Sequence, residues 1–169
     1  MLRRTETIDD TVLSANGWHA KPFQERPGFL IRRLHQIHVA LFVEECGSEK
    51  ITPVQYSILS ALDQMGNVEQ IALSRAVGLD TTNVADVLAR LERQRMVRRR
   101  FSPRDKRRKV VTLTEAGRAA LRRIDAGAAR AHERTLAALE PKARARFVRD
   151  LARLVELNKV VGPALLALR

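Results

Sequence analysis

Residues 69–88 read EQIALSRAVGLDTTNVADVL, and the pattern of this stretch decides the fold. Gly78 permits the left-handed backbone of a tight turn, and Ala72 is small where two short helices must cross closely. The apolar residues around the turn are spaced to fill the wedge between those helices: Leu79, Val84 and Leu88. We therefore predict one helix over about 68–77 and a second capped by Asp80, joined as a helix-turn-helix.

A cationic hairpin follows directly, in residues 96–113, MVRRRFSPRDKRRKVVTL. The two ends of this segment have strand character, over about 96–101 and 110–113, and residues 102–108 form a polar turn between them. Between residues 90 and 109, eleven side chains are basic and two are acidic, against a net charge of +12 for the whole chain. A helix-turn-helix followed by such a hairpin is a winged helix, which places one helix in the DNA major groove and the wing along the backbone or minor groove.

Upstream of this region the pattern predicts two further helices. From about Gly28 to Gly47, side chains recur at helical spacing in two neighbouring stripes: Leu30, Leu34, Ile37 and Leu41, and beside them Ile31, His35, His38 and Phe42. A helix with two such stripes usually packs against two partners. Thr52 and Pro53 mark the start of a second helix, which Gly66 ends. Its expected buried face is Val54, Ile58, Leu59 and Leu62.

Downstream, Thr114 starts a long helix that reaches about Leu139, and Pro141 opens a last one. The apolar residues of the last helix are Phe147, Leu151, Leu154 and Val155. The outer helices are too long and too apolar to be buried by the middle of the chain alone, so we expect them to pack against a second copy. The predicted fold is mainly α with a small β-hairpin wing. Its parts are an extended N-terminal arm (1–27), dimerisation helices (28–50 and 115–169) and a winged helix-turn-helix DNA-binding domain (51–114).

The wing sequence DKRRKVVTLTEAG, residues 105–117, resembles the D-x-R…L-T-x-x-G signature of the MarR (multiple antibiotic resistance regulator) family. The resemblance extends over about residues 28–165. It implies a homodimer whose first and last helices form the dimerisation domain, and a small-molecule or redox signal that loosens DNA binding. We expect a repressor that binds double-stranded DNA at a pseudo-palindromic operator.

The resemblance also implies which residues meet DNA. By position, Arg107 resembles the wing arginine that enters the minor groove, and Asp105 resembles the acid that orients it. Arg90 has two interpretations, a DNA contact or an ion pair with a neighbouring acid. The expected contacts from the two short helices and the wing are Ser74, Arg75, Thr81, Thr82, Ala85, Asp86, Arg90, Arg104, Asp105, Lys106, Arg107 and Arg108.

The effector site is expected on the first long helix and just before it. His35 and His38 are buried, hydrogen-bonded residues in one interpretation and part of a pocket for an organic anion in another; a metal site lacks a third ligand at suitable spacing. Residues 28–42, GFLIRRLHQIHVALF, are similar to regulators of aromatic-acid catabolism in the family, which implies an aromatic carboxylate or its CoA thioester as effector. The candidate ligand contacts are Trp18, His19, Arg26, Arg32, Arg33, His35, His38 and Phe42.

Other classes of protein fit the sequence less well. The single cysteine, Cys46, excludes an intramolecular disulfide and a cysteine-rich zinc site, but leaves peroxide sensing as an alternative signal. We expect no enzyme and no cofactor, because the sequence contains no catalytic triad, phosphate loop or metal cluster. No segment has the apolar length of a signal peptide or membrane span, so we expect a cytoplasmic protein with no membrane partner. An architectural protein that binds DNA without sequence preference would explain the charge equally well.

Overall fold

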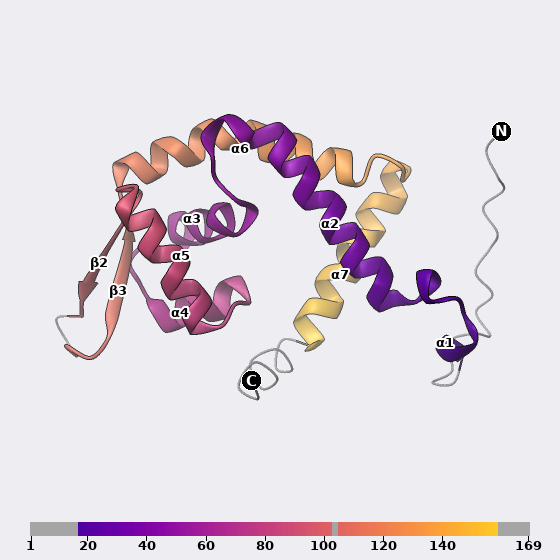
Figure 1. Ribbon diagram of the computed structural model, residues 1–169, viewed down its shortest axis with the longest axis horizontal. Helices are drawn as coiled ribbons and strands as arrows, with labels where there is room; N and C mark the ends of the chain where they lie inside the picture. Colours follow the sequence, from indigo (N-terminus) through magenta and orange to yellow (C-terminus); the bar gives the residue numbers. More distant parts are fainter. Residues whose placement is uncertain (1–16, 103–104, 159–169) are drawn as a thin grey trace.

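The computed structural model describes residues 17–102 and 105–158, except for the side chain of His19. The elements run α1 (Gly17–Ala20), η2 (Phe23–Glu25), α2 (Pro27–Cys46), η3 (Gly47–Glu49), α3 (Pro53–Met65), β1 (Val68–Glu69), α4 (Gln70–Val77), α5 (Thr81–Arg93), β2 (Val97–Phe101), β3 (Lys109–Leu113), α6 (Glu115–Thr135) and α7 (Pro141–Asn158). Figure 1 shows the small sheet at one end of a largely helical molecule. The predicted fold class is confirmed.

Local signals set the ends of the helices in the middle of the chain. Thr52 and Gln55 form a reciprocal capping box at the start of α3, in which each side chain accepts the other residue's backbone N–H. Gly78 adopts φ 67°, the left-handed conformation that the turn between α4 and α5 requires. The Asp80 carboxylate then accepts the backbone N–H of Asn83 at 2.7 Å and caps α5. The helix-turn-helix is therefore built from its own short-range sequence.

The sheet has three antiparallel strands in the order β1-β3-β2, one more than predicted. Val68 pairs with Val111 of β3, and Phe101 at the end of β2 pairs with Lys109. The prediction that residues 68–69 begin a helix is wrong, because they pair with β3 and the helix starts two residues later than predicted, at Gln70. A two-residue strand is too short to show a period of two, so its formation depends on a partner more than forty residues away.

The core lies where α3, α4 and α5 pack against the sheet, and it continues along α6 as far as Ala131, with Phe42 and Cys46 at the end of α2 packed into it. Its largest fully buried side chains are Phe42, Ile58, Leu59, Leu62, Leu73, Leu88, Leu91, Ile124, Val84 and Val111. Val54 was expected on this face but is exposed, because it lies in the first turn of α3, one turn before the buried Ile58, where the core cluster does not cover it. Gly117 packs against the backbone of Met96, the residue just before β2: a Cβ at position 117 would meet the backbone oxygen of Met96 at 2.2 Å. The glycine of the L-T-x-x-G motif is thus required by close packing.

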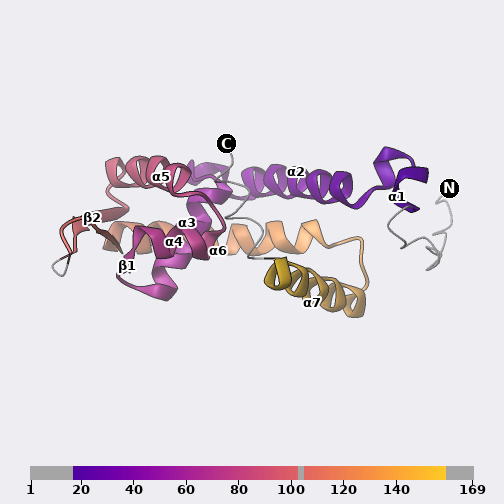
Figure 2. The same cartoon turned by 90° about the horizontal axis from the view of Figure 1, so that it is seen from below.

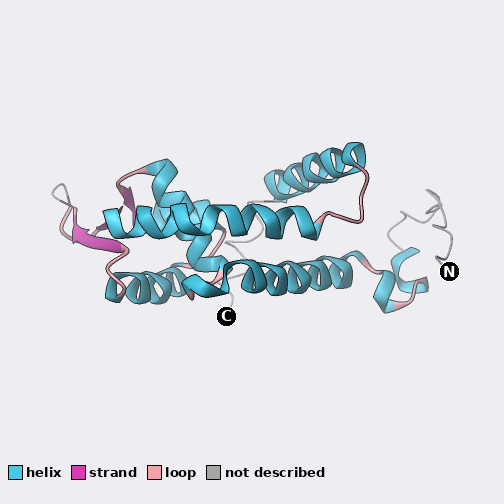
Figure 3. Cartoon of the chain, turned by 90° about the horizontal axis from the view of Figure 1, so that it is seen from above, coloured by secondary structure: helices cyan, strands magenta, loops and turns pink. Residues whose placement is uncertain are grey.

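The outer helices leave the winged helix as a pair. Figures 2 and 3 show α2 and α6 extending side by side, with α7 folding back from the end of α6. α6 ends at Thr135 and not near Leu139, because turns replace the helix and the Arg144 side chain donates to the carbonyls of Ala137 and Leu139. In the described part of the arm, α1 and η2 replace the expected extended chain. No helix in the described ranges is apolar over the length that a membrane crossing needs.

Candidate nucleic-acid interface

The helix α5 has one buried and one exposed face. Val84, Leu88 and Leu91 are fully buried and hold the helix against the core. Among the predicted contacts, Thr81 and Thr82 at the start of the helix and Asp86 and Arg90 farther along it are exposed, while Ala85 is half-buried. Arg90 is exposed, and among the described residues no ion pair joins it to an acid. The arrangement gives α5 the accessible polar edge that a recognition helix needs.

The wing tip is organised by Asp105. One carboxylate oxygen of Asp105 accepts the backbone N–H of Arg107 at 2.9 Å and lies 3.7 Å from its Nε. The backbone oxygen of Asp105 accepts the N–H of Arg108 at 2.9 Å, which closes the turn. The Arg107 side chain is 95% exposed. The tip therefore presents a guanidinium to solvent from a fixed turn; Arg104 lies outside the described residues.

The start of α5 and the wing tip share one surface. A hollow between them is lined by Glu69, Gln70, Ile71, Thr81, Arg107, Arg108 and Lys109. It joins the first residue of α5 to the arginine at the tip, and three of its residues are cationic. A surface of this kind, with helix N-termini and arginines on one side, suits the phosphates and groove edges of duplex DNA.

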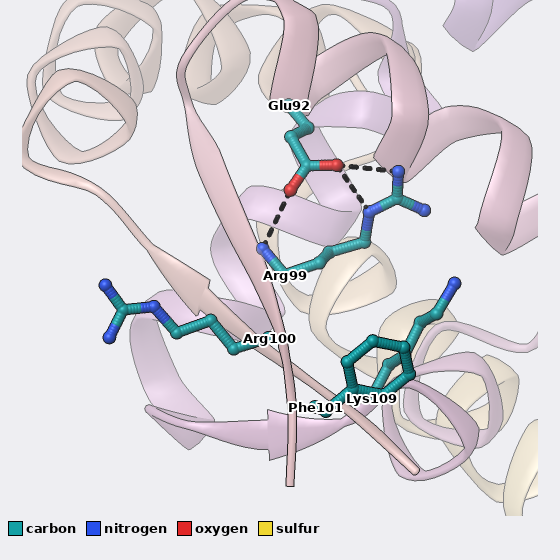
Figure 4. A pocket seen from close by; sticks show the side chains of 5 residues that line it. All are labelled: Glu92, Arg99, Arg100, Phe101 and Lys109. Atoms are coloured by element: carbon teal, nitrogen blue, oxygen red, sulfur yellow. Dashed lines mark hydrogen bonds and ion pairs between the residues drawn. The ribbon is translucent and has the colours of Figure 1, made fainter. Parts of the chain in front are cut away.

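A second contact joins the other end of α5 to the wing. Figure 4 shows Glu92 reaching from α5 to Arg99 on β2, with Phe101 and Lys109 beside them and Arg100 pointing away. The Lys109 Nζ lies 6.0 Å from the centre of the exposed Phe101 ring. Sequence reasoning missed Glu92, Arg99, Phe101 and Lys109, although the alternation of side chains along two paired strands places the last three on one face.

Two predicted DNA contacts are changed by the structure. Ser74 is 2% exposed, and its hydroxyl donates to the carbonyls of Gln70 and Ile71 in its own helix, so we remove it from the interface. Arg108 remains 55% exposed but pairs with Glu69 at 2.9 Å and with Asp105 at 3.4 Å, so its charge is partly balanced within the protein. Arg75 and Lys106 are exposed, as a contact with phosphate requires.

The candidate effector residues lie along α2 and in the segment that precedes it. His38 faces α6, where its Nδ1 lies 2.9 Å from the Thr135 hydroxyl and its ring stacks on His132 with centroids 5.1 Å apart. Burial, followed by the nearby His132 and His35, lowers the pKa of His38. His38 is therefore a partly buried, hydrogen-bonded histidine, the simpler of its two interpretations. His132 was missed, since it lies on a helix that the ligand argument did not consider.

The other candidates have different surroundings, although Phe42 lies next to His38 with ring centroids 6.5 Å apart. Phe42 is 1% exposed and packs against Tyr56 with ring centroids 5.4 Å apart, so we assign it to the core. Trp18 lies before α2 begins, with Lys21 over its ring at 5.9 Å, and His19 has no described side chain. Along α2, Arg32, Arg33 and His35 are exposed, and Arg26 donates to the Lys21 carbonyl at 3.2 Å.

Cys46 is a buried thiol at the end of α2. Its side chain is 3% exposed, and its Sγ lies 4.0 Å from the Ile124 carbonyl oxygen. Burial raises the pKa of the Cys46 thiol, because the interior disfavours the thiolate. Reactive cysteines are accessible and have lowered pKa values, so this environment opposes peroxide sensing. Within the described ranges, histidine, cysteine and acidic side chains form no cluster of three that would hold a metal.

Comparison with known proteins places this geometry in one family. The sequence pattern that defines the MarR family matches residues 51–109, which span α3 to the start of β3. The chain is 27% identical to the HTH-type transcriptional repressor NicR of Pseudomonas putida, over 82% of this chain and 87% of NicR.

Two solved structures share the fold over most of their length. One comes from work on the regulation of DNA binding of Bordetella bronchiseptica BpsR by 6-hydroxynicotinic acid: TM-score 0.75, 30% identity, 79% of this chain and 96% of that chain. The other is the PcaV transcriptional regulator of Streptomyces coelicolor with its natural ligand: TM-score 0.75, 32% identity, 80% of this chain and 96% of that chain. With a matching family pattern, a matching wing and these relatives, the chain belongs to the MarR family of transcriptional regulators.

Proposed function

We propose that the protein is a ligand-responsive transcriptional repressor that binds a pseudo-palindromic operator as a homodimer. The observation that carries this proposal is the shared surface of α5 and the wing, where Thr81 and Arg107 line one hollow. The helix α5 enters the major groove and Arg107 the minor groove beside it. The proposed DNA contacts are Arg75, Thr81, Thr82, Ala85, Asp86, Arg90, Asp105, Lys106 and Arg107.

The second copy packs against the outer helices. The helix α7 buries none of its residues within the single chain. Large apolar side chains are exposed along α2 and α7: Leu30, Ile31, Ile37, Val43, Val148, Leu151, Leu154, Val155 and Leu157. Apolar faces of this extent in a water-exposed protein mark an interface. Residues 28–50 and 115–169 therefore form the dimerisation part, and residues 51–114 form the DNA-binding domain.

The effector of this repressor is an aromatic carboxylate or its CoA thioester. Support comes from two similar proteins of known structure: 6-hydroxynicotinic acid regulates DNA binding by BpsR, and PcaV was solved in complex with its natural ligand. On this chain, Arg32, Arg33 and His35 offer exposed cationic and aromatic groups beside the half-buried His38. Arginine binds carboxylates and phosphates through paired hydrogen bonds, which suits both forms of the ligand.

The test begins with DNA. Duplexes that the wild-type protein selects from random sequence are footprinted, and we expect two protected half-sites about one helical turn apart, roughly 34 Å. Calorimetry with a panel of aromatic acids and their CoA thioesters then identifies a binder that releases this duplex. Protection spread evenly over any sequence would support an architectural protein and contradict a repressor. Operator binding that no compound of the panel weakens would contradict the effector class alone.

A further inference from the structure

A chain of charged side chains runs from β1 to the wing tip. Glu69 ends β1 and directly precedes α4, the first helix of the helix-turn-helix. Its two carboxylate oxygens lie 3.2 and 2.9 Å from one Nη of Arg108. Arg108 in turn places its Nε 3.4 Å from Asp105, the residue that holds the backbone of Arg107. Four side chains thus connect the start of α4 to the exposed arginine.

The position of Glu69 is unfavourable for attraction to DNA. It lines the hollow that also holds Arg107, Arg108 and Lys109, so its negative charge lies on the surface that faces phosphate. It also neutralises Arg108, which removes one cation from that surface. If overall affinity for a polyanion were the only requirement, an uncharged residue at position 69 would serve better.

We infer that Glu69 is a positioning residue for DNA recognition, which fixes the wing tip relative to α5 through Arg108 and Asp105. The inference rests on the proposed function. β1 and β3 pair through only two residue pairs, Val68 with Val111 and Glu69 with Val110, so the backbone holds this corner weakly. The ion pair extends that contact to the tip itself. Glu69 thereby weakens the attraction to DNA of any sequence, but it holds Arg107 in a defined position beside Thr81.

Removal of the Glu69 carboxylate distinguishes the positioning of Arg107 from the effect of net charge. Glu69→Gln removes a negative charge and frees Arg108, so affinity for DNA of arbitrary sequence should rise, with a salt dependence that is steeper by up to about one counterion per protomer. Affinity for the selected duplex should not rise in proportion, because Arg107 is no longer held in place. The ratio of selected to scrambled affinity should fall about tenfold or more, the range of one lost specific contact per half-site.

The experiment compares a duplex selected by the wild-type protein with a scrambled duplex of the same composition, at several salt concentrations. The variants are Glu69→Gln, Arg108→Gln and the double variant. If Glu69 acts through Arg108, the double variant should lose no more specificity than Glu69→Gln alone. Asp63→Asn is the charge control, since it removes an acid from an ion pair with Arg118 on α6, and it should leave the ratio unchanged. Unchanged melting temperatures exclude a general loss of folding.

A ratio that stays at the wild-type value in Glu69→Gln would overturn the inference, whether both affinities rise together or neither changes. Equal loss of ratio in Asp63→Asn would also overturn it, because the effect would then be one of net charge. These outcomes differ from failure of the proposed function, in which the wild-type protein itself selects no sequence.

Discussion

Glu92 on α5 and Arg99 on β2 are joined by three short contacts. One carboxylate oxygen of Glu92 accepts the backbone N–H of Arg99 at 2.9 Å, and the other accepts Nε at 2.8 Å and lies 2.7 Å from Nη2. Burial raises the pKa of Glu92, but the hydrogen bonds from the Arg99 side chain and backbone outweigh it and lower the pKa. The pair fixes the angle between the recognition helix and the wing.

Substitution of Glu92 should therefore loosen the wing. Glu92→Ala removes the acceptor of a backbone N–H as well as the ion pair, and we expect a loss of about 1 kcal/mol in the free energy of unfolding. Urea denaturation at fixed protein concentration measures it. Glu115→Ala is the matched control, because its partners Arg118 and Arg122 lie on the solvent side of α6. Equal stability of the two variants would show that Glu92 contributes no more than a surface acid.

Gly127 allows α2 and α6 to cross closely. A Cβ at this position would lie 2.7 Å from the backbone oxygen of Glu45 and 3.0 Å from the sulfur of Cys46. Gly127→Ala should destabilise the protein by about 1–3 kcal/mol through overpacking, although alanine favours helix by about 1 kcal/mol in an open position. Gly47→Ala is the control, since a Cβ there meets nothing within 4 Å. Thermal unfolding of both variants decides; a Gly127→Ala protein as stable as wild type would refute the close approach.

His38 should make stability depend on pH. Burial and the neighbouring His132 and His35 lower its pKa below the ordinary value of 6.5, so the folded protein favours the neutral ring. Between the folded and unfolded pKa values the unfolded chain binds more protons, and stability rises with pH. The contribution of the neutral His38 ring to the free energy of unfolding is complete above about pH 6.5, and it is lost as the pH falls toward the pKa of His38 in the folded protein. His38→Gln should reduce the rise of the unfolding free energy with pH just below about pH 6.5, and His35→Gln should keep most of that slope; a slope retained in His38→Gln would contradict the assignment.

The parts of the fold that could be predicted from sequence are those set by short-range chemistry. Thr52, Gly78 and Asp80 act on their own helix ends, so their roles are visible within four residues of each. β1 was not predicted because it exists only through pairing with β3. The helical spacing that marked Val54 as buried is a property of the helix, whereas burial depends on which neighbours cover its first turn.

The same distinction holds for the candidate site. Asp105 and Arg107 are two residues apart, and the motif that contains them suggested their contact. Glu69 meets Arg108 across 39 residues, a relation that no local pattern reveals. Ser74 and Arg75 were both expected to contact DNA from the same helix, but adjacent helical positions point to different faces, and Ser74 is buried.

The burial of Cys46 predicts insensitivity to peroxide. The thiol is 3% exposed and its pKa is raised by burial, so little thiolate is present to react. Brief treatment of the native protein with peroxide should leave DNA binding unchanged, and Cys46→Ser should behave in the same way. Mass spectrometry of the treated protein reports oxidation directly. Release of wild-type protein from DNA by peroxide, abolished in Cys46→Ser, would establish the redox signal that this environment opposes.

Arg107 should carry a large part of the affinity for DNA. Its side chain is 95% exposed, and Asp105 fixes its backbone, so little reorganisation is needed when the guanidinium enters the minor groove. Arg107→Ala should weaken binding to the selected duplex by about 1–3 kcal/mol per half-site and reduce the slope of log affinity against log salt. The control for net charge is Arg149→Ala, which removes an exposed arginine of α7 and should change neither quantity by much.

The wild-type protein itself should lose roughly 10³–10⁵-fold in affinity between about 50 and 200 mM salt if about six to ten phosphates are neutralised per dimer. A flat salt dependence, or full affinity in Arg107→Ala, would mean that the wing does not lie on DNA. A guanidinium that enters the minor groove attracts the phosphates, so its removal must weaken binding.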